Sequence, residues 1–139
     1  MVHIRYVEQG DRAFWFQLDR HLSPAEFDKK VRDQMGYVLL EEDDPVALLR
    51  YHLFWDNTPF CSMLFVAPDA QRRGYGRALM EHWEREMGAL GYKIVLVSTQ
   101  ADEDAQHFYR KLGYKDAGGL VLNCPAYSQA MELFFMKAL

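Results

Sequence analysis

The sequence predicts a single mixed α/β domain whose sheet is mostly antiparallel, and three observations support this. Strand-like runs over residues 37–41, 46–55 and 60–66 are separated by two segments rich in turn residues, which is typical of an antiparallel meander. A strand, helix, strand, helix order over residues 60–113 indicates a crossover between parallel strands. The length of 139 residues fits one domain, residues 1–139, around one core.

The first part of the chain predicts a strand and two helical segments. Residues 3–7 form a short strand pattern, and apolar residues over 14–22 indicate a loosely helical segment. A clearer helix begins at Ser23, a capping residue followed by proline at the first helical position and a glutamate that reaches back to the cap. Its apolar face carries residues at spacing four, namely Phe27, Val31 and Met35. We expect Gly36 to end this helix.

Two helices and three strands are predicted after the meander. Apolar residues recur at spacings of three and four between Gly76 and Gly91, which predicts an amphipathic helix. Residues 93–99 indicate a buried strand rich in isoleucine and valine, and a helix is expected from near Asp102 to Gly113. Residues 120–122 and 130–137 predict two final strands joined by a loop.

Composition and charge exclude several classes of protein. Half of the residues are hydrophobic and 26% are charged, which is typical of a packed globular domain. The net charge of -4 argues against a nucleic-acid-binding surface. The sequence contains neither a membrane-spanning apolar run nor the apolar core of a signal peptide, so we expect a cytoplasmic protein with no membrane partner. Two cysteines and five histidines without ligand spacing predict neither a disulfide nor a metal site.

The segment from Val66 to Ala78 has the chemistry of an anion cradle. It runs from a strand into a helix, whose first turn presents unpaired N–H groups and the positive end of the helix dipole. Gly74 and Gly76 let a phosphate approach the backbone, and three arginines supply charge. The segment lacks the Lys-Ser/Thr ending of a nucleotide-hydrolysing P-loop and the third glycine of a dinucleotide fingerprint. The alternative interpretation is a glycine turn beside a solvated arginine cluster.

Two motifs give the chain a resemblance to a known superfamily. Residues 71–76, Gln-Arg-Arg-Gly-Tyr-Gly, match the Q/R-x-x-G-x-G/A coenzyme A signature of the GCN5-related N-acetyltransferase (GNAT) superfamily. Residues 105–114, from the alanine through Phe-Tyr to Leu-Gly-Tyr, resemble its second signature. The resemblance implies a GNAT-like fold, in which about four helices flank a mostly antiparallel twisted sheet of about seven strands. Asp102 departs from the family, which often carries asparagine there and so an amide donor that aspartate lacks.

The resemblance also implies an activity and a set of site residues. It implies an enzyme that moves an acetyl group from acetyl-coenzyme A directly to a primary amine of a small-molecule or peptide acceptor. Tyr109 would protonate the departing thiolate. The residues expected to bind the cosubstrate are Leu64, Phe65, Val66, Gln71, Arg72, Arg73, Gly74, Tyr75, Gly76, Arg77 and Asp102.

Several alternatives remain open from the sequence. The base that deprotonates the amine is His52, Glu41, Glu132 or a water chain. An acceptor pocket or the core could take the aromatic residues Phe14, Trp15, Tyr51, Trp55 and Tyr127. From other functional classes, a non-catalytic acyl-coenzyme A sensor and a protein-interaction domain with a basic loop compete with the enzyme. The sequence does not decide whether the domain forms a homodimer through its last strands.

Overall fold

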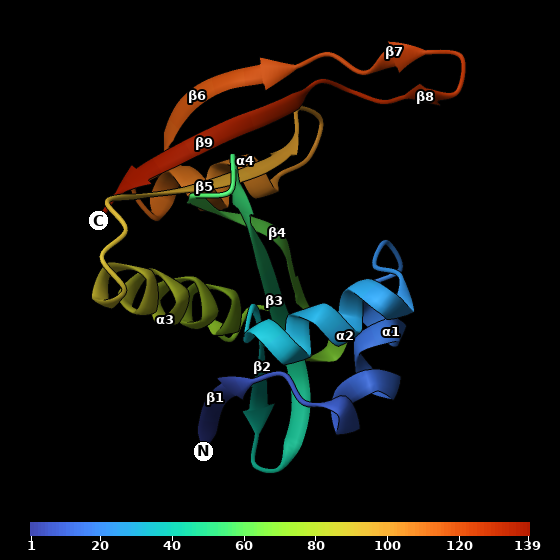
Figure 1. Cartoon of the computed structure of the whole chain (residues 1–139), viewed down its shortest axis with the longest axis vertical. Coiled ribbons are helices and arrows are strands. Elements are labelled where there is room, and N and C mark those ends of the chain that lie inside the picture. The colour runs from blue at the N-terminus through green and yellow to red at the C-terminus, as the bar shows by residue number, and fades with distance from the viewer.

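The computed structural model describes residues 1–139 and confirms the predicted mixed α/β class (Figure 1). Its main sheet has seven strands in the order β1-β2-β3-β4-β5-β9-β6. The strands are β1 (Val2–Tyr6), β2 (Gly36–Glu41), β3 (Asp44–Phe54), β4 (Thr58–Val66), β5 (Ile94–Gln100), β6 (Lys115–Leu120), β7 (Asn123–Cys124), β8 (Tyr127–Ser128) and β9 (Glu132–Ala138). The helices are α1 (Arg12–Leu18), α2 (Pro24–Asp33), α3 (Tyr75–Ala89) and α4 (Ala105–Lys111).

The sheet is an antiparallel meander that separates at one parallel junction. Strands β1 to β4 pair antiparallel in sequence order, and α3 is the crossover to the parallel strand β5. Paired residues between β4 and β5 are limited to Phe60 with Leu96 and Cys61 with Val97. Beyond Cys61, toward the end of β4, no strand pairing joins the two halves of the sheet. Figure 1 shows β5, β9 and β6 diverging there from β3 and β4.

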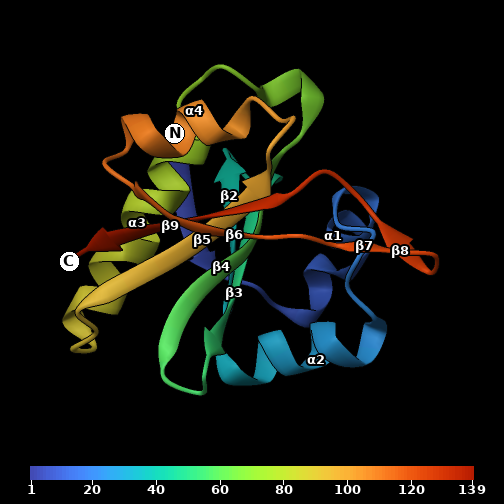
Figure 2. The ribbon, with the colours of Figure 1, turned by 90° about the horizontal axis from the view of Figure 1, so that it is seen from above.

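The alternation of side chains along the strands produces a core on each face of the sheet. Leu39 and Leu49 pack with Trp83 of α3 in the larger cluster, which has 16 buried residues. Their neighbours Val38 and Leu48 point the other way, into a cluster of 6 buried residues with α1 and α2. Figure 2 shows α3 on one side of the sheet and α1 and α2 on the other.

The expectation that Gly36 ends the second helix is wrong. Helix α2 ends at Asp33, and Gln34 adopts the left-handed conformation at its C-terminus, with φ of 57°. Gly36 instead begins β2, where its backbone is extended and buried. A Cβ at this position would lie 2.9 Å from Cγ1 of Val7, the residue after β1, and 3.3 Å from the Trp15 ring, so close packing explains the glycine.

The strand expected over residues 120–122 is also misplaced. The chain forms β6 earlier, over Lys115–Leu120, as an edge strand with every residue exposed. Its glycine-rich sequence lacks the β-branched pattern of a strand, and pairing with β9 stabilises it. The following residues form the short β7–β8 hairpin, which extends beyond the sheet (Figure 1). None of the helices has both the length and the apolar sequence needed to cross a membrane.

Candidate active site

The loop between β4 and α3 presents backbone N–H groups beside the place where β4 and β5 separate. Arg72 and Gly74 both have left-handed backbone conformations, with φ of 66° and 81°. These turns lead into α3, where the N–H of Ala78 is bonded to the carbonyl of Gly74 at 3.0 Å. The preceding amides, over residues 75–77, lie in the first turn, where a helix has no acceptors of its own. This end of α3 therefore favours a bound anion.

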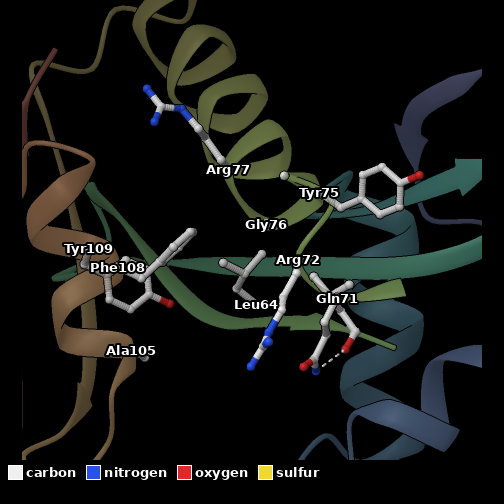
Figure 3. Close-up of a pocket in the computed structure, with 11 residues that line it drawn as sticks. Leu64, Gln71, Arg72, Tyr75, Gly76, Arg77, Ala105, Phe108 and Tyr109 are labelled. Carbon is white, nitrogen blue, oxygen red and sulfur yellow. Dashed lines mark hydrogen bonds between the residues drawn. The ribbon is translucent and has the colours of Figure 1, made fainter. Parts of the chain in front are cut away.

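A cavity of about 460 Å³ lies beside this loop (Figure 3). Residues of the loop and of α4 face each other across it, with Leu64 of β4 between them. A Cβ on Gly76 would lie 3.4 Å from Cζ of Phe108, so glycine keeps the passage between α3 and α4 open. The lining residues are Leu64, Val66, Gln71, Arg72, Gly74, Tyr75, Gly76, Arg77, Ala105, Phe108 and Tyr109. Backbone amides, arginines and an apolar wall fit a diphosphate joined to a flexible arm.

Glu41 at the end of β2 holds Arg73 of the loop and Tyr75, the first residue of α3. Arg73 donates to both carboxylate oxygens of Glu41, at 2.9 and 2.7 Å, and the Tyr75 hydroxyl donates to the same carboxylate. The Tyr75 and Arg73 contacts lower the pKa of Glu41. Arg73 therefore anchors the loop to the sheet, whereas Arg72 and Arg77 line the cavity.

A second cavity, of about 1010 Å³, opens on the other side of β4. It is bordered by the α1–α2 connection, by β3, by β5 and by the chain between β8 and β9. Five residues line both cavities, namely Leu64, Val66, Gln71, Ala105 and Tyr109. The two cavities therefore meet where β4 and β5 separate, and a molecule in each would share this wall.

Tyr109 lies at this shared wall. Helix α4 packs its ring against the core, where the side chain is 6% exposed, next to Tyr114 and Phe135. Its hydroxyl has no hydrogen-bond partner in the protein, and the hydroxyl oxygen is not fully buried. Burial, and then the neighbouring Cys61 and two glutamates, raises the pKa of Tyr109 well above its usual range. The phenol therefore stays protonated and can donate a hydrogen bond into the cavities.

Glu132 is the one candidate base that lines the second cavity. Ser98 donates to its Oε2 at 2.7 Å, and the side-chain amide of Gln129 donates to its Oε1 at 2.9 Å. Glu41 is held at the loop described above. His52 is exposed, contacts the Ser62 hydroxyl at 2.5 Å and lines neither of the two cavities.

Cys61 also lines the second cavity but has little nucleophilic character. Its thiol is 3% exposed and contacts the carbonyl oxygen of Met63 at 3.7 Å. Burial raises the pKa of Cys61 to about 12. The thiolate, which is the reactive form, is therefore almost absent at neutral pH.

The expected cosubstrate-binding residues fall into two groups. Eight of the eleven line the 460 Å³ cavity, and the exceptions are Phe65, Arg73 and Asp102. Phe65 lines the second cavity instead, and Asp102 is exposed in the turn before α4, which begins at Ala105, and lines neither. Of the five aromatic residues considered for an acceptor pocket, Tyr127 alone lines the second cavity.

Sequence reasoning missed Arg50, Ser98 and Gln129, which line the second cavity. Arg50 could have been noticed as a lone charge within an apolar strand pattern, because such a residue needs a partner when it is buried. Ser98 and Gln129 carry no comparable local signal.

Comparisons with known proteins agree with this geometry. The family model described as "Acetyltransferase (GNAT) family" matches residues 4–114. No curated protein sequence matches. The ribosomal-protein-S18-alanine N-acetyltransferase of Escherichia coli has a similar structure, with a TM-score of 0.79 and 20% identity over 99% of this chain and 94% of that one.

Two further solved structures share the fold. An N-acetyltransferase from Staphylococcus aureus has a TM-score of 0.82 and 18% identity, over 99% of this chain and 98% of its own. A GNAT family acetyltransferase from Elizabethkingia anophelis, with acetyl-CoA bound, has a TM-score of 0.77 and 14% identity, again over 99% and 98%.

Proposed function

Because the chain belongs to the acetyltransferase (GNAT) family and is therefore an N-acetyltransferase, we propose that it moves the acetyl group of acetyl-coenzyme A directly to a primary amine of a small-molecule or peptide acceptor. The observation that carries this proposal is the wall at Tyr109 that the two cavities share. Each substrate can occupy its own cavity, and the reacting groups can come into contact at this wall. The acetyl-CoA and the S18 alanine in the names of two similar structures support the two substrate classes.

The residues of the 460 Å³ cavity take the cosubstrate in this proposal. The first turn of α3, together with Arg72 and Arg77, binds the diphosphate, and Leu64 and Val66 contact the pantetheine arm. Phe65 adds its backbone to this strand edge. Arg73 keeps the loop in place through Glu41, and the exposed Asp102 makes at most a peripheral contact. Acetyl-coenzyme A supplies an activated thioester to the shared wall.

Two side chains then handle protons. An alkylamine with a pKa near 10.4 is almost fully protonated at neutral pH, so it needs a proton acceptor before it attacks. Glu132 takes that role, because Ser98 and Gln129 fix its carboxylate in the acceptor cavity. Tyr109 donates the proton that the leaving sulfur receives. The ammonium nitrogen thus loses two protons, one to Glu132 before it attacks and one as the acetyl group is transferred. The second proton replaces the one that Tyr109 gives to sulfur, so coenzyme A leaves as a thiol and Tyr109 is again a phenol.

Direct transfer is favoured over an acetyl-cysteine intermediate. Cys61 is the only thiol that lines the acceptor cavity, and its pKa of about 12 leaves too little thiolate to attack. Cys124 is exposed on the β7–β8 hairpin and lines neither cavity.

Thiol release with a panel of amines tests this function. We expect release of coenzyme A that depends on the amine and yields an equal amount of N-acetylated product. Calorimetry on the same sample should show that acetyl-coenzyme A binds. Binding without turnover on any amine would support a non-catalytic sensor, and absence of binding would support a protein-interaction domain.

A further inference from the structure

Arg50 enters the second cavity from β3 and is only 12% exposed. Its Nε donates to Oδ2 of Asp19 at 2.7 Å, and Nη2 lies 3.5 Å from Oδ1. Asp19 is fully buried and is fixed in turn by the indole N–H of Trp15 at 3.0 Å. The remaining nitrogen, Nη1, has no hydrogen-bond partner in the protein. It is not fully buried, because the only fully buried side-chain nitrogen without a partner is Nε1 of Trp83.

A second cation, Lys30, is buried close to Arg50. Lys30 of α2 is buried and donates to the backbone carbonyl of Tyr51, the residue after Arg50, at 2.7 Å. No carboxylate lies within salt-bridge distance of Lys30, and Glu26 and Asp33 act on it only from farther away, whereas Asp19 pairs directly with Arg50. Burial, and then the like charge of Arg50, lowers the pKa of Lys30. An anion placed at Nη1 would be attracted by Arg50 and by the nearby Lys30 in a region of low dielectric constant.

The opposite wall of the cavity has the opposite charge. Glu132 of β9 and Glu103, just before α4, line it there, whereas the exposed Arg20 and His21 line the rim near Arg50. Strands β3 and β9 are three places apart in the sheet, and because β4 and β5 are unpaired beyond Cys61, their backbones lie farther apart here than the about 14 Å of three regular strand spacings. The arginine and glutamate side chains reach inward from these two sides.

We propose that Arg50 is an anion-binding residue of the acceptor site, and that the acceptor is an amine that also carries a carboxylate. This inference rests on the proposed function, because it assigns the amine end to Glu132. The carboxylate binds Nη1 of Arg50 while Asp19 holds the guanidinium in place. The same chemistry is offered by a free amino acid and by a peptide with an acidic first residue.

Matched substrate pairs test the inference on the unmodified protein. One arm compares glycine, β-alanine, γ-aminobutyrate and 5-aminovalerate with their amides, so that the spacing between amine and carboxylate increases stepwise. The other arm compares glutamyl-alanyl-alaninamide with glutaminyl-alanyl-alaninamide. We expect kcat/KM to favour the carboxylate by about tenfold or more in at least one pair, as one charge-assisted hydrogen bond would give. A preference among the amino acids identifies a free amino acid as the acceptor, and a preference for the glutamyl peptide identifies a peptide with an acidic first residue.

A double variant locates the preference, and equilibrium binding provides a readout besides turnover. Arg50→Met with Asp19→Asn removes both charges together, because removing Arg50 alone would leave a buried carboxylate unpaired. The acid should lose its advantage over the amide, both in kcat/KM and in calorimetric binding of the acetylated product. Arg12→Met with Asp28→Asn is the control, since it removes an exposed arginine–aspartate pair, between α1 and α2, that lines neither cavity.

The outcomes separate the two proposals. Equal use of acid and amide in every pair, or a preference for the amide, overturns the carboxylate subsite and leaves the acetyltransferase intact. A carboxylate preference that survives in the folded double variant overturns the assignment to Arg50. No turnover of any amine while acetyl-coenzyme A is bound overturns the proposed function and this inference with it. If the double variant does not fold, the substrate pairs still decide whether the carboxylate is recognised.

Discussion

We expect the reaction rate to depend strongly on a single atom, the hydroxyl oxygen of Tyr109. In Tyr109→Phe the ring keeps its contacts with Tyr114 and Phe135, and only the hydroxyl is lost. Loss of a positioned general acid should lower the single-turnover rate by about 100-fold or more, with coenzyme A affinity and melting temperature almost unchanged. An unchanged rate between about pH 6 and 9 would remove Tyr109 from the chemistry.

Gly76 tests the phosphate cradle with an equally small change. In Gly76→Glu a side chain enters the passage toward Phe108, and a negative charge is placed at the N-terminus of α3 where the diphosphate should bind. Calorimetry should detect no coenzyme A binding to a folded protein. Gly88→Glu is the matched control, because it makes the same change near the other end of α3, where a Cβ has no neighbour within 4 Å. Similar affinities in the two variants would place the cosubstrate elsewhere.

The connection between β4 and α3 depends on a distant strand for its shape. Glu41 of β2 bonds Arg73 and Tyr75, so Glu41→Gln should weaken both contacts and let the loop sample other conformations. We expect coenzyme A to bind several-fold more weakly, because each binding event then has to order the loop, while the rate of the chemical step at saturation changes little. Glu42→Gln, at the adjacent exposed position, should leave coenzyme A affinity unchanged. Equal affinity of wild-type and Glu41→Gln protein would contradict an anchoring role.

Elements with a strong local pattern were predictable from the sequence. Helix α3 has a regular apolar face, and the meander has turn residues at each reversal, so both were placed within a few residues. Gly36 and β6 were misplaced because long-range packing decides them. Val7 and Trp15 exclude a side chain at Gly36, and pairing with β9 extends an edge strand through a glycine-rich segment.

The same distinction separates the two halves of the candidate site. The cradle residues are consecutive in the sequence, so a motif was sufficient to identify them. The contacts of the acceptor cavity join residues far apart, since Arg50 meets Asp19 across 31 positions and Ser98 meets Glu132 across 34. Because β3, β5 and β9 bring these side chains together only in the folded sheet, sequence spacing gave no signal for them.

At the scale of the whole molecule, the Arg50–Asp19 pair links the smaller core to the sheet and should make stability depend on pH. Burial alone would raise the pKa of Asp19, but the contact with Arg50 and the bonds from His21 and Trp15 lower it below its ordinary value of 3.8. The folded state thus binds fewer protons than the unfolded one in this window. The resulting stability is present above about pH 3.8 and is lost as pH falls through the lowered pKa.

Urea unfolding at about pH 6 and about pH 3 measures this dependence. The Arg50→Met, Asp19→Asn variant should be less stable than the wild type at the higher pH and should lose less stability on acidification. The exposed Arg12→Met, Asp28→Asn control should keep the wild-type dependence, because exposed pairs contribute little. If the buried-pair variant loses as much stability in acid as the wild type, the pair does not contribute in this way.

Two cavities with one common wall lie where β4 separates from β5, and we expect the acetyl group to pass directly between molecules bound on its two sides. Rapid-quench single turnover with acetyl-labelled coenzyme A, excess enzyme and an accepted amine measures that transfer most directly. Direct transfer predicts that label moves from coenzyme A to the amine nitrogen at one rate, with no label on the protein at any time. A labelled protein species that forms before the acetylated amine and decays as it appears would contradict direct transfer.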